Sequence, residues 1–196
     1  KDRRGDIRLL EKLGVIYGYN IDAIKKAHDR GLIISSTKIR NEIEVGNLHK
    51  AGGLLGRPYS IYGKVVKGNQ IGRTINIPTA NQIMKEYKCL PPVGVYGSLI
   101  SIDGKLYEGI SNLGYKPTVD SNNSVMGLET YIFDFEGGIY DKYIEVYPIR
   151  YVRKEMTFAS IGELCEQMEN DIKNIKSSIG EIMEEYYELC GVKAGY

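Results

Sequence analysis

Several residue types are scarce in this chain, and each scarcity narrows the classes of protein to which it can belong. The 196 residues contain no tryptophan, two histidines and three cysteines. Cys89, Cys165 and Cys190 lie far apart and form no Cys-x-x-Cys pair. This spacing argues against a zinc site or a disulfide framework. Cys165 and Cys190 lie on the apolar face of an expected helix, which favours thiols in a core.

Long hydrophobic runs are also missing. No apolar stretch approaches the roughly 20 residues that a membrane-spanning helix needs, and no segment has the features of a signal peptide. Hydrophobic residues still make up 42% of the chain, which is enough to form a core. We therefore expect a cytoplasmic protein without a membrane partner.

The chain also lacks a large excess of charge of one sign, since its formal net charge at pH 7 is only +1. The charges are nevertheless unevenly placed: residues 1–57 carry 12 Lys and Arg against 7 Asp and Glu, whereas residues 159–196 carry 3 against 8. The basic end suits either RNA and phosphates or an ordinary helix-rich surface. We favour the surface, and nucleic acid is the less expected partner.

Tyrosine, in contrast, occurs 16 times, and it suits strands and the walls of binding sites for flat rings. The turn-forming pair Asp103-Gly104 predicts a type I′ hairpin, and the polar segment 121–124 is expected to be a loop beside the site. Evenly spaced strands with glycine-rich turns indicate a small antiparallel barrel. The alternating segments that predict these strands are residues 61–67, 95–102, 105–112, 129–135 and 143–151.

The last part of the chain has helical periodicity. From Ser160 onward, apolar residues recur every three or four positions and form one stripe. Ser160 and Glu163 form a capping box, and Gly180 is expected to divide the run into two helices. We expect the stripe to pack on the barrel and assign it no cofactor.

The basic first part predicts shorter elements. They are a helix that Asp6 caps, a strand over residues 15–19 and a helical turn over residues 21–27. Ser35 or Ser36 can cap a further helix. The N-terminus of that helix is either an anion site or a capped helix end and nothing more.

The segment 68–81 is the most distinctive in the chain. Gly68 and Gly72 can adopt positive φ and let backbone N–H groups approach a ligand closely. Arg73 can place its planar guanidinium against phosphate oxygens. The segment is therefore a candidate phosphate loop, although a glycine-rich hairpin followed by a proline turn accounts for the same residues equally well.

A possible metal site follows the candidate loop. Pro78 fixes its own φ, and an extended backbone beyond it would place Thr79 and Asn81 on one face and Ala80 on the other. A hydroxyl beside an amide carbonyl offers two oxygen ligands that suit a phosphate-bound Mg²⁺.

Five motifs in this order resemble those of riboflavin kinases, and the resemblance covers residues 57–175. It implies an α+β fold, a six-stranded antiparallel Greek-key barrel with C-terminal helices. It also implies an enzyme that uses ATP and Mg²⁺ to phosphorylate the 5′-hydroxyl of riboflavin, giving FMN and ADP. One departure is Asn76, which stands where the family usually has glycine. The motifs are residues 68–81, 92–96, 112–119, 128–135 and 153–158.

The resemblance adds roles to those of the loop and the two metal ligands. Glu129 would be the catalytic base, although on the residues alone an exposed edge-strand carboxylate fits it too. Asn112 would border the nucleotide or the ribityl chain. Arg153 would contact the flavin or its new phosphate, unless Arg153 and Glu155 form a surface ion pair. Tyr and Phe residues between positions 131 and 158 would form the slot for the flavin ring.

A second resemblance concerns residues 34–40, which are similar to the Ile-Ser-Ser-Thr-x-Ile-Arg motif of nucleotidylyltransferases. In bacterial bifunctional FAD synthetases that motif lies directly before the kinase domain. Residues 1–56 would then be the C-terminal remnant of an α/β adenylyltransferase domain with its connector, and residues 57–196 the kinase barrel with its helices. His28 and His49 lie outside any His-x-Gly-His motif, so we expect no FAD synthetase activity from this chain. Apolar residues of the first segment predict marginal order or self-association.

Two other functions stay open. A non-catalytic flavin-binding regulatory module would keep the barrel, but the presence of Thr79, Asn81 and Glu129 together argues against it. An oligonucleotide-binding barrel would show salt-sensitive binding of single strands. That second function does not explain the Pro-Thr-Ala-Asn step.

Overall fold

The computed structural model describes residues 6–22, 27–29, 32–68, 77–85, 87–118 and 121–191. It divides into two compact units, residues 1–35 and 36–196. The predicted division into segments 1–56 and 57–196 remains a prediction.

The first unit contains helix α1 (Ile7–Tyr17) and a hairpin of β1 (His28–Asp29) and β2 (Leu32–Ile33). The carboxylate of Asp6 accepts a hydrogen bond from the N–H of Leu9 at 2.9 Å, so the predicted cap is confirmed. The predicted strand over 15–19 is wrong, because α1 continues until Gly18 ends it in the left-handed conformation, with φ of 71°. The turn predicted over residues 21–27 falls largely outside the described residues.

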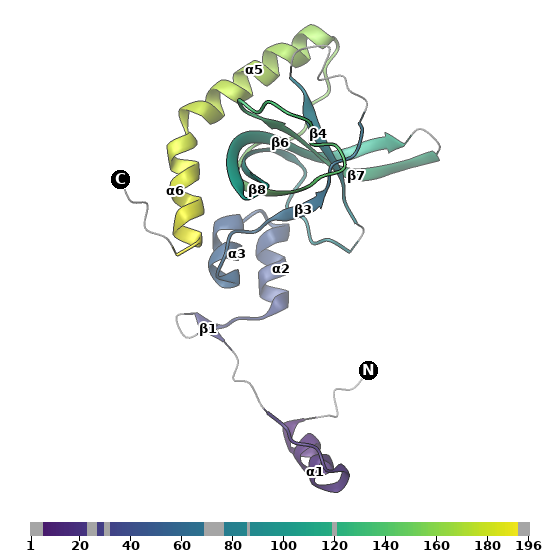
Figure 1. The fold of residues 1–196 in the computed structure, drawn as a ribbon, viewed down its shortest axis with the longest axis vertical. Helices are drawn as coiled ribbons and strands as arrows, with labels where there is room; N and C mark the ends of the chain where they lie inside the picture. The colour runs from purple at the N-terminus through teal and green to yellow at the C-terminus, as the bar shows by residue number, and fades with distance from the viewer. Residues whose placement is uncertain are drawn as a thin grey trace. The chain divides into compact units, whose positions relative to one another are not determined.

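The second unit is built on one antiparallel sheet with the strand order β3-β8-β5-β6-β7-β4. A backbone bridge between Val66 and Asn81 connects its two edges, so the sheet forms a nearly closed barrel (Figure 1). The predicted six-stranded antiparallel barrel is confirmed. Its strands are β3 (Ile61–Lys64), β4 (Thr79–Ile83), β5 (Gly94–Ile102), β6 (Lys105–Thr118), β7 (Ser121–Ile132) and β8 (Tyr143–Arg153).

Turns decide where the strands end. Asp103 and Gly104 have φ of 49° and 80°, as the predicted type I′ hairpin requires. The loop predicted over residues 121–124 is wrong, since their backbone belongs to β7, which pairs with β6 in a ribbon that extends away from the barrel (Figure 1). The strand predicted over 129–135 ends at Ile132, because Asp134 turns the chain with φ of 50°.

The barrel interior is closed at one end by helices α2 (Ser36–Glu44) and α3 (Leu48–Leu55). Ile43, Leu48 and Ala51 from these helices share one buried cluster with the inward side chains of the strands. Gln82 helps to seal the seam, since its amide nitrogen donates to the carbonyl oxygens of Gly63 at 3.0 Å and Ile144 at 3.3 Å.

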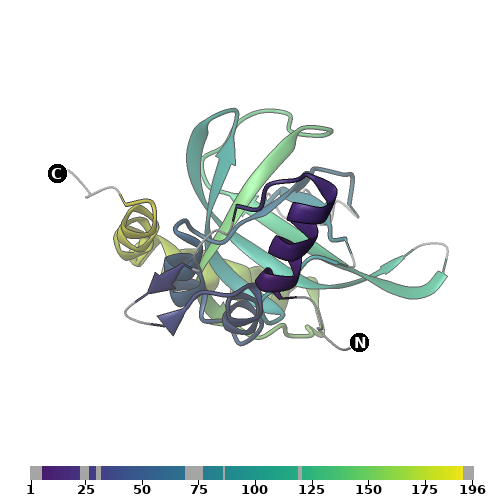
Figure 2. The ribbon, with the colours of Figure 1, turned by 90° about the horizontal axis from the view of Figure 1, so that it is seen from below.

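Helices α5 (Ile161–Ser177) and α6 (Ile179–Leu189) cover the outside of the barrel, as Figures 1 and 2 show. The middle of the predicted apolar stripe, Ile175 and Ile182, is buried against the strands. Ser160 caps α5 as predicted, since its hydroxyl accepts from the N–H of Glu163 at 3.2 Å, whereas the Glu163 carboxylate accepts from the N–H of Ala159 at 3.0 Å and so does not complete the capping box. The two helices meet at Ser178, whereas Gly180, the predicted break, lies inside α6.

Candidate functional site

The register of the sheet aligns predicted site residues in one row. Asn81 on β4 pairs with Glu129 on β7, and Glu129 pairs with Asn112 on β6. The row continues through Val95 on β5 to Arg153 on β8. Residues up to 72 positions apart in the sequence, Asn81 and Arg153, are therefore brought to one level of the barrel wall.

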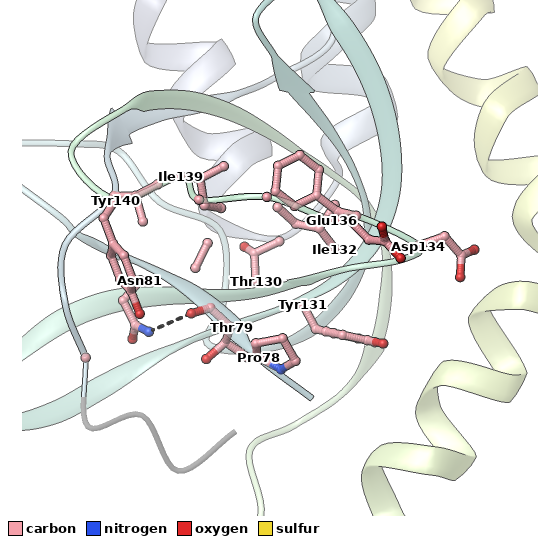
Figure 3. A pocket seen from close by; sticks show the side chains of 16 residues that line it. Pro78, Thr79, Asn81, Thr130, Tyr131, Ile132, Asp134, Glu136, Ile139 and Tyr140 are labelled. Carbon is pink, nitrogen blue, oxygen red and sulfur yellow. Dashed lines mark hydrogen bonds between the residues drawn. The ribbon is translucent and has the colours of Figure 1, made fainter. Parts of the chain in front are cut away.

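A cavity of about 260 Å³ is lined by residues of β4 and β7, among them Asn81 of this row (Figure 3). Gly68, Thr79 and Asn81 form part of its wall, and the connection after β7, residues 134–140, forms another part. Ala80 packs in the barrel core, as the predicted alternation along the strand requires, although it also lines this cavity.

A second cavity of about 130 Å³ adjoins the first. Thr79 and Tyr131, which pair across β4 and β7, line both cavities and form their common wall. The second cavity is lined by both polar and apolar side chains, a combination suited to a flat ring that carries a polar chain. Its other lining residues are Val95, Ile110, Asn112, Glu129, Arg153, Glu155, Met156, Phe158, Leu164, Met168 and Asp171.

Gly68 touches the side chain of Asn81. A Cβ atom at Gly68 would lie 2.6 Å from the Cγ and Nδ2 atoms of Asn81, so this close approach requires glycine. Asn81 is buried, and its amide nitrogen donates to the carbonyl oxygen of Thr79 at 3.3 Å (Figure 3). Gly72, Arg73 and Asn76 lie outside the described residues, so their places in the predicted loop remain predictions.

Lys116 is a site residue that sequence reasoning missed. Its ammonium group donates to Oδ1 of Asn81 and lies 2.5 Å from Oε1 of Glu129. Residue alternation along β6 was the signal available, because Lys116 stands four positions after Asn112 and so faces the same side. The ammonium thus joins the wall of the first cavity to the wall of the second.

Asn112 is held by Glu155, whose Oε1 accepts from its amide nitrogen at 3.0 Å. Oδ1 of Asn112 is buried and has no hydrogen-bond partner within the described part of the chain. A buried acceptor without a donor is costly unless a ligand supplies one. Asn112 therefore marks a place where a hydroxyl or N–H group of a ligand would bind.

Arg153 pairs with Asp171 of α5, and not with Glu155 as the alternative prediction had it. Nε of Arg153 donates to Oδ2 of Asp171 at 2.9 Å, and Nη2 donates to the same atom at 2.6 Å. The Asp171 carboxylate is only 3% exposed and also accepts from Gln167 at 2.8 Å. This buried pair fixes α5 beside the second cavity.

Helix α5 also contributes residues that the sequence prediction left without a role. Leu164 and Met168 belong to the apolar stripe and line the second cavity. Their spacing of four positions on one helix face could have suggested a shared apolar wall. The middle of the apolar stripe thus packs on the barrel, and its start lines the second cavity.

The oxygen donors at the first cavity suit a hard cation. Among the described residues, no group of three or more His, Cys, Asp or Glu side chains could hold a metal ion. Mg²⁺ often uses only one or two protein ligands together with phosphate and water oxygens, so Thr79 and Asn81 fit it. Oδ1 of Asn81 already accepts a hydrogen bond from the ammonium group of Lys116.

The fold and its two adjoining cavities define a small β-barrel with room for two ligands. A family model described as Flavokinase, riboflavin kinase, matches residues 55–179. The chain therefore belongs to the riboflavin kinase family, which confirms the predicted resemblance. No helix in the described part of the chain is long and apolar enough to cross a membrane.

Individual relatives agree with this assignment. The bifunctional riboflavin kinase/FMN adenylyltransferase of Buchnera aphidicola is 41% identical over 171 residues, covering 87% of this chain and 54% of that protein. The protein of the same name from Escherichia coli K12 is 36% identical over 170 residues, covering 86% and 53%. A crystal structure described as a macrolide-efflux protein from Streptococcus pneumoniae superposes with a TM-score of 0.67 at 33% identity, covering 85% and 54%. The chain spans about half the length of the curated relatives that it matches.

Proposed function

We propose that this chain transfers the γ-phosphoryl group of ATP to the 5′-hydroxyl of riboflavin, giving FMN and ADP. The observation that carries the proposal is the common wall of the two cavities. Thr79 and Tyr131 line both, and Asn81 of the first cavity is the cross-strand partner of Glu129 of the second. Two substrates bound on either side of this wall would bring their reacting groups together at one row of side chains.

The first cavity would hold the nucleotide. Gly68 brings backbone close to Asn81, and Gly72 and Arg73 would complete the phosphate cradle. Thr79 and Asn81 would hold Mg²⁺, which when bound would neutralise charge on the phosphate oxygens.

The second cavity would hold riboflavin. Its apolar side chains suit the ring, and the unpaired Oδ1 of Asn112 would accept from a ribityl hydroxyl. Arg153 would carry its positive charge on the flavin side while Asp171 holds it in place. The hydroxyl oxygen attacks the γ-phosphorus, its proton passes to Glu129, and ADP leaves.

The role of Glu129 is tested by Glu129→Gln. We expect turnover to fall by about 10²–10⁴-fold, because the amide cannot accept the proton, while riboflavin binding measured by flavin fluorescence is retained. Near-normal turnover of this variant would show that Glu129 is not the base. Loss of both turnover and riboflavin binding would instead make Glu129 a binding residue.

Synthesis of FAD is a separate matter. The relatives named for both activities are about twice the length of the matched region. We propose that this chain makes FMN but not FAD, and that residues 1–56 correspond to the end of an adenylyltransferase domain.

A further inference from the structure

We propose that Lys116 is a positioning residue that occupies the cation position at Asn81 when no metal–nucleotide is bound, and that it competes with the metal for Oδ1 of that residue. The inference rests on the proposed function for the identity of the ligands. Through Lys116, binding of the nucleotide in the first cavity would change the contacts of Glu129 in the second cavity.

Lys116 bonds to two acceptors that lie on different strands. Its ammonium donates to Asn81 and to Glu129, which belong to different cavities and different strands. An ammonium and a divalent cation cannot both sit at hydrogen-bond or coordination distance from one amide oxygen without strong repulsion. A metal that binds Asn81 must therefore displace Lys116 from it.

Gly127 leaves space for the aliphatic part of the Lys116 side chain. A Cβ atom at Gly127 of β7 would lie 2.9 Å from Cε and 3.0 Å from Cδ of Lys116. No positive φ at Gly127 requires a glycine there, since its backbone is that of an ordinary strand. The missing side chain thus serves to let Lys116 lie flat across β7 toward Asn81.

The side chain of Lys116 is also accessible to solvent. It is 31% exposed, so the ammonium can leave Asn81 without unfolding the strand around it. On release it can stay with Glu129 and turn a donor toward an incoming phosphate oxygen. Glu129 would then change its surroundings only when the nucleotide cavity is filled.

The test is the affinity for Mn²⁺, used in place of Mg²⁺, at saturating ADP and read by electron paramagnetic resonance. Lys116→Met should bind Mn²⁺ about three- to tenfold more tightly than the parent chain, since a competing positive charge has been removed. Gly127→Ala keeps the charge of Lys116 but displaces its aliphatic side chain. This variant should also bind Mn²⁺ more tightly than the parent chain, but by a smaller factor than Lys116→Met. Lys50→Met is the matched control, because Lys50 of α3 pairs with Glu42 of α2 and neither residue lines either cavity.

Unchanged or weaker Mn²⁺ binding in both Lys116→Met and Gly127→Ala, with ADP binding intact and a cooperative thermal transition, would overturn the proposal. Lys116→Met should also lower kcat more than it raises the KM for riboflavin, because Glu129 loses the group that orients it. If the parent chain itself forms no FMN, the proposed function fails, whereas the Mn²⁺ titration still reports on the competition.

Discussion

The site depends on a few side chains whose partners are set by strand register. Asn81, Glu129 and Asn112 are consecutive along one row, so each polar group has a neighbour at the distance of paired strands. Glu129 and Asn81 are joined by Lys116, and Asn112 is joined to Glu155. Within the described residues, only Oδ1 of Asn112 in this row is buried without a partner.

That unpaired acceptor leads to a prediction about substrate affinity. Asn112→Ala should weaken riboflavin binding by about tenfold, the order expected for one lost hydrogen bond in a buried site, and leave ADP binding unchanged. Isothermal titration with each ligand would measure both. Equal losses for riboflavin and ADP would contradict the assignment of Asn112 to the flavin cavity.

Some of these residues could be found from the sequence and others could not. Thr79, Asn81, Glu129 and Asn112 stand in distinctive motifs, and strand alternation already placed Thr79 beside Asn81. The partner of Arg153 was missed, because Asp171 lies in a helix whose rotation against the barrel no local pattern encodes.

Among the elements, α5 connects stability to the site. Its first turns line the second cavity through Leu164 and Met168, and Asp171 anchors it to β8 through Arg153. Its last turns pack in the outer core through Ile175. The predicted break at Gly180 was displaced to Ser178, where the hydroxyl bonds back to the carbonyl of Asn174 at 3.1 Å.

Removing the buried carboxylate should therefore destabilise the fold. We expect Asp171→Asn to lower the free energy of unfolding by about 3 kcal/mol or more, since it leaves the Arg153 charge without its counter-ion. Glu181→Gln is a suitable control, because Glu181 pairs with Arg150 but is 70% exposed. Its effect should stay below about 1 kcal/mol. Urea denaturation would compare the two, and equal effects would contradict a special role for the buried pair.

The strands show why element boundaries were harder to predict than element type. The alternating segments were found, but β6 and β7 run beyond the barrel because they pair with each other there. The polar composition of residues 121–124 indicated a loop, and tertiary pairing of the ribbon overrode that local preference.

In the whole molecule, helices α2 and α3 close one end of the barrel, and two buried tyrosine hydroxyls bond to backbone carbonyl groups there. Tyr59 donates to the carbonyl oxygen of Cys89 at 2.5 Å, and Tyr96 donates to the carbonyl of Pro92. Burial raises the pKa of both phenols above the ordinary value of 10.0. The folded chain therefore keeps these two protons at a pH where the unfolded chain loses them.

The stability of the barrel should consequently fall as the pH rises past about 10, and be fully present below that value. Urea midpoints measured from pH 8 to 11 would show the decline. Tyr59→Phe should make the decline shallower, because one proton difference between the folded and unfolded states is removed. An identical slope in the parent chain and in Tyr59→Phe would contradict the role of the buried phenols.

The organisation of the whole chain was predictable in part. The barrel and the outer helices followed from strand alternation, glycine-rich turns and the apolar stripe. The two cavities did not, because a common wall at Thr79 and Tyr131 exists only once β4 and β7 pair at the edge of the sheet. The family match covers residues 55–179, which include every predicted site residue.

The most direct test of the central claim is to incubate the chain with riboflavin, ATP and Mg²⁺ and to separate the flavins by chromatography. We expect FMN in amounts equal to the ADP formed, with no FAD. Riboflavin recovered unchanged, although it binds to the protein, would contradict phosphotransfer and favour a flavin-binding regulatory module.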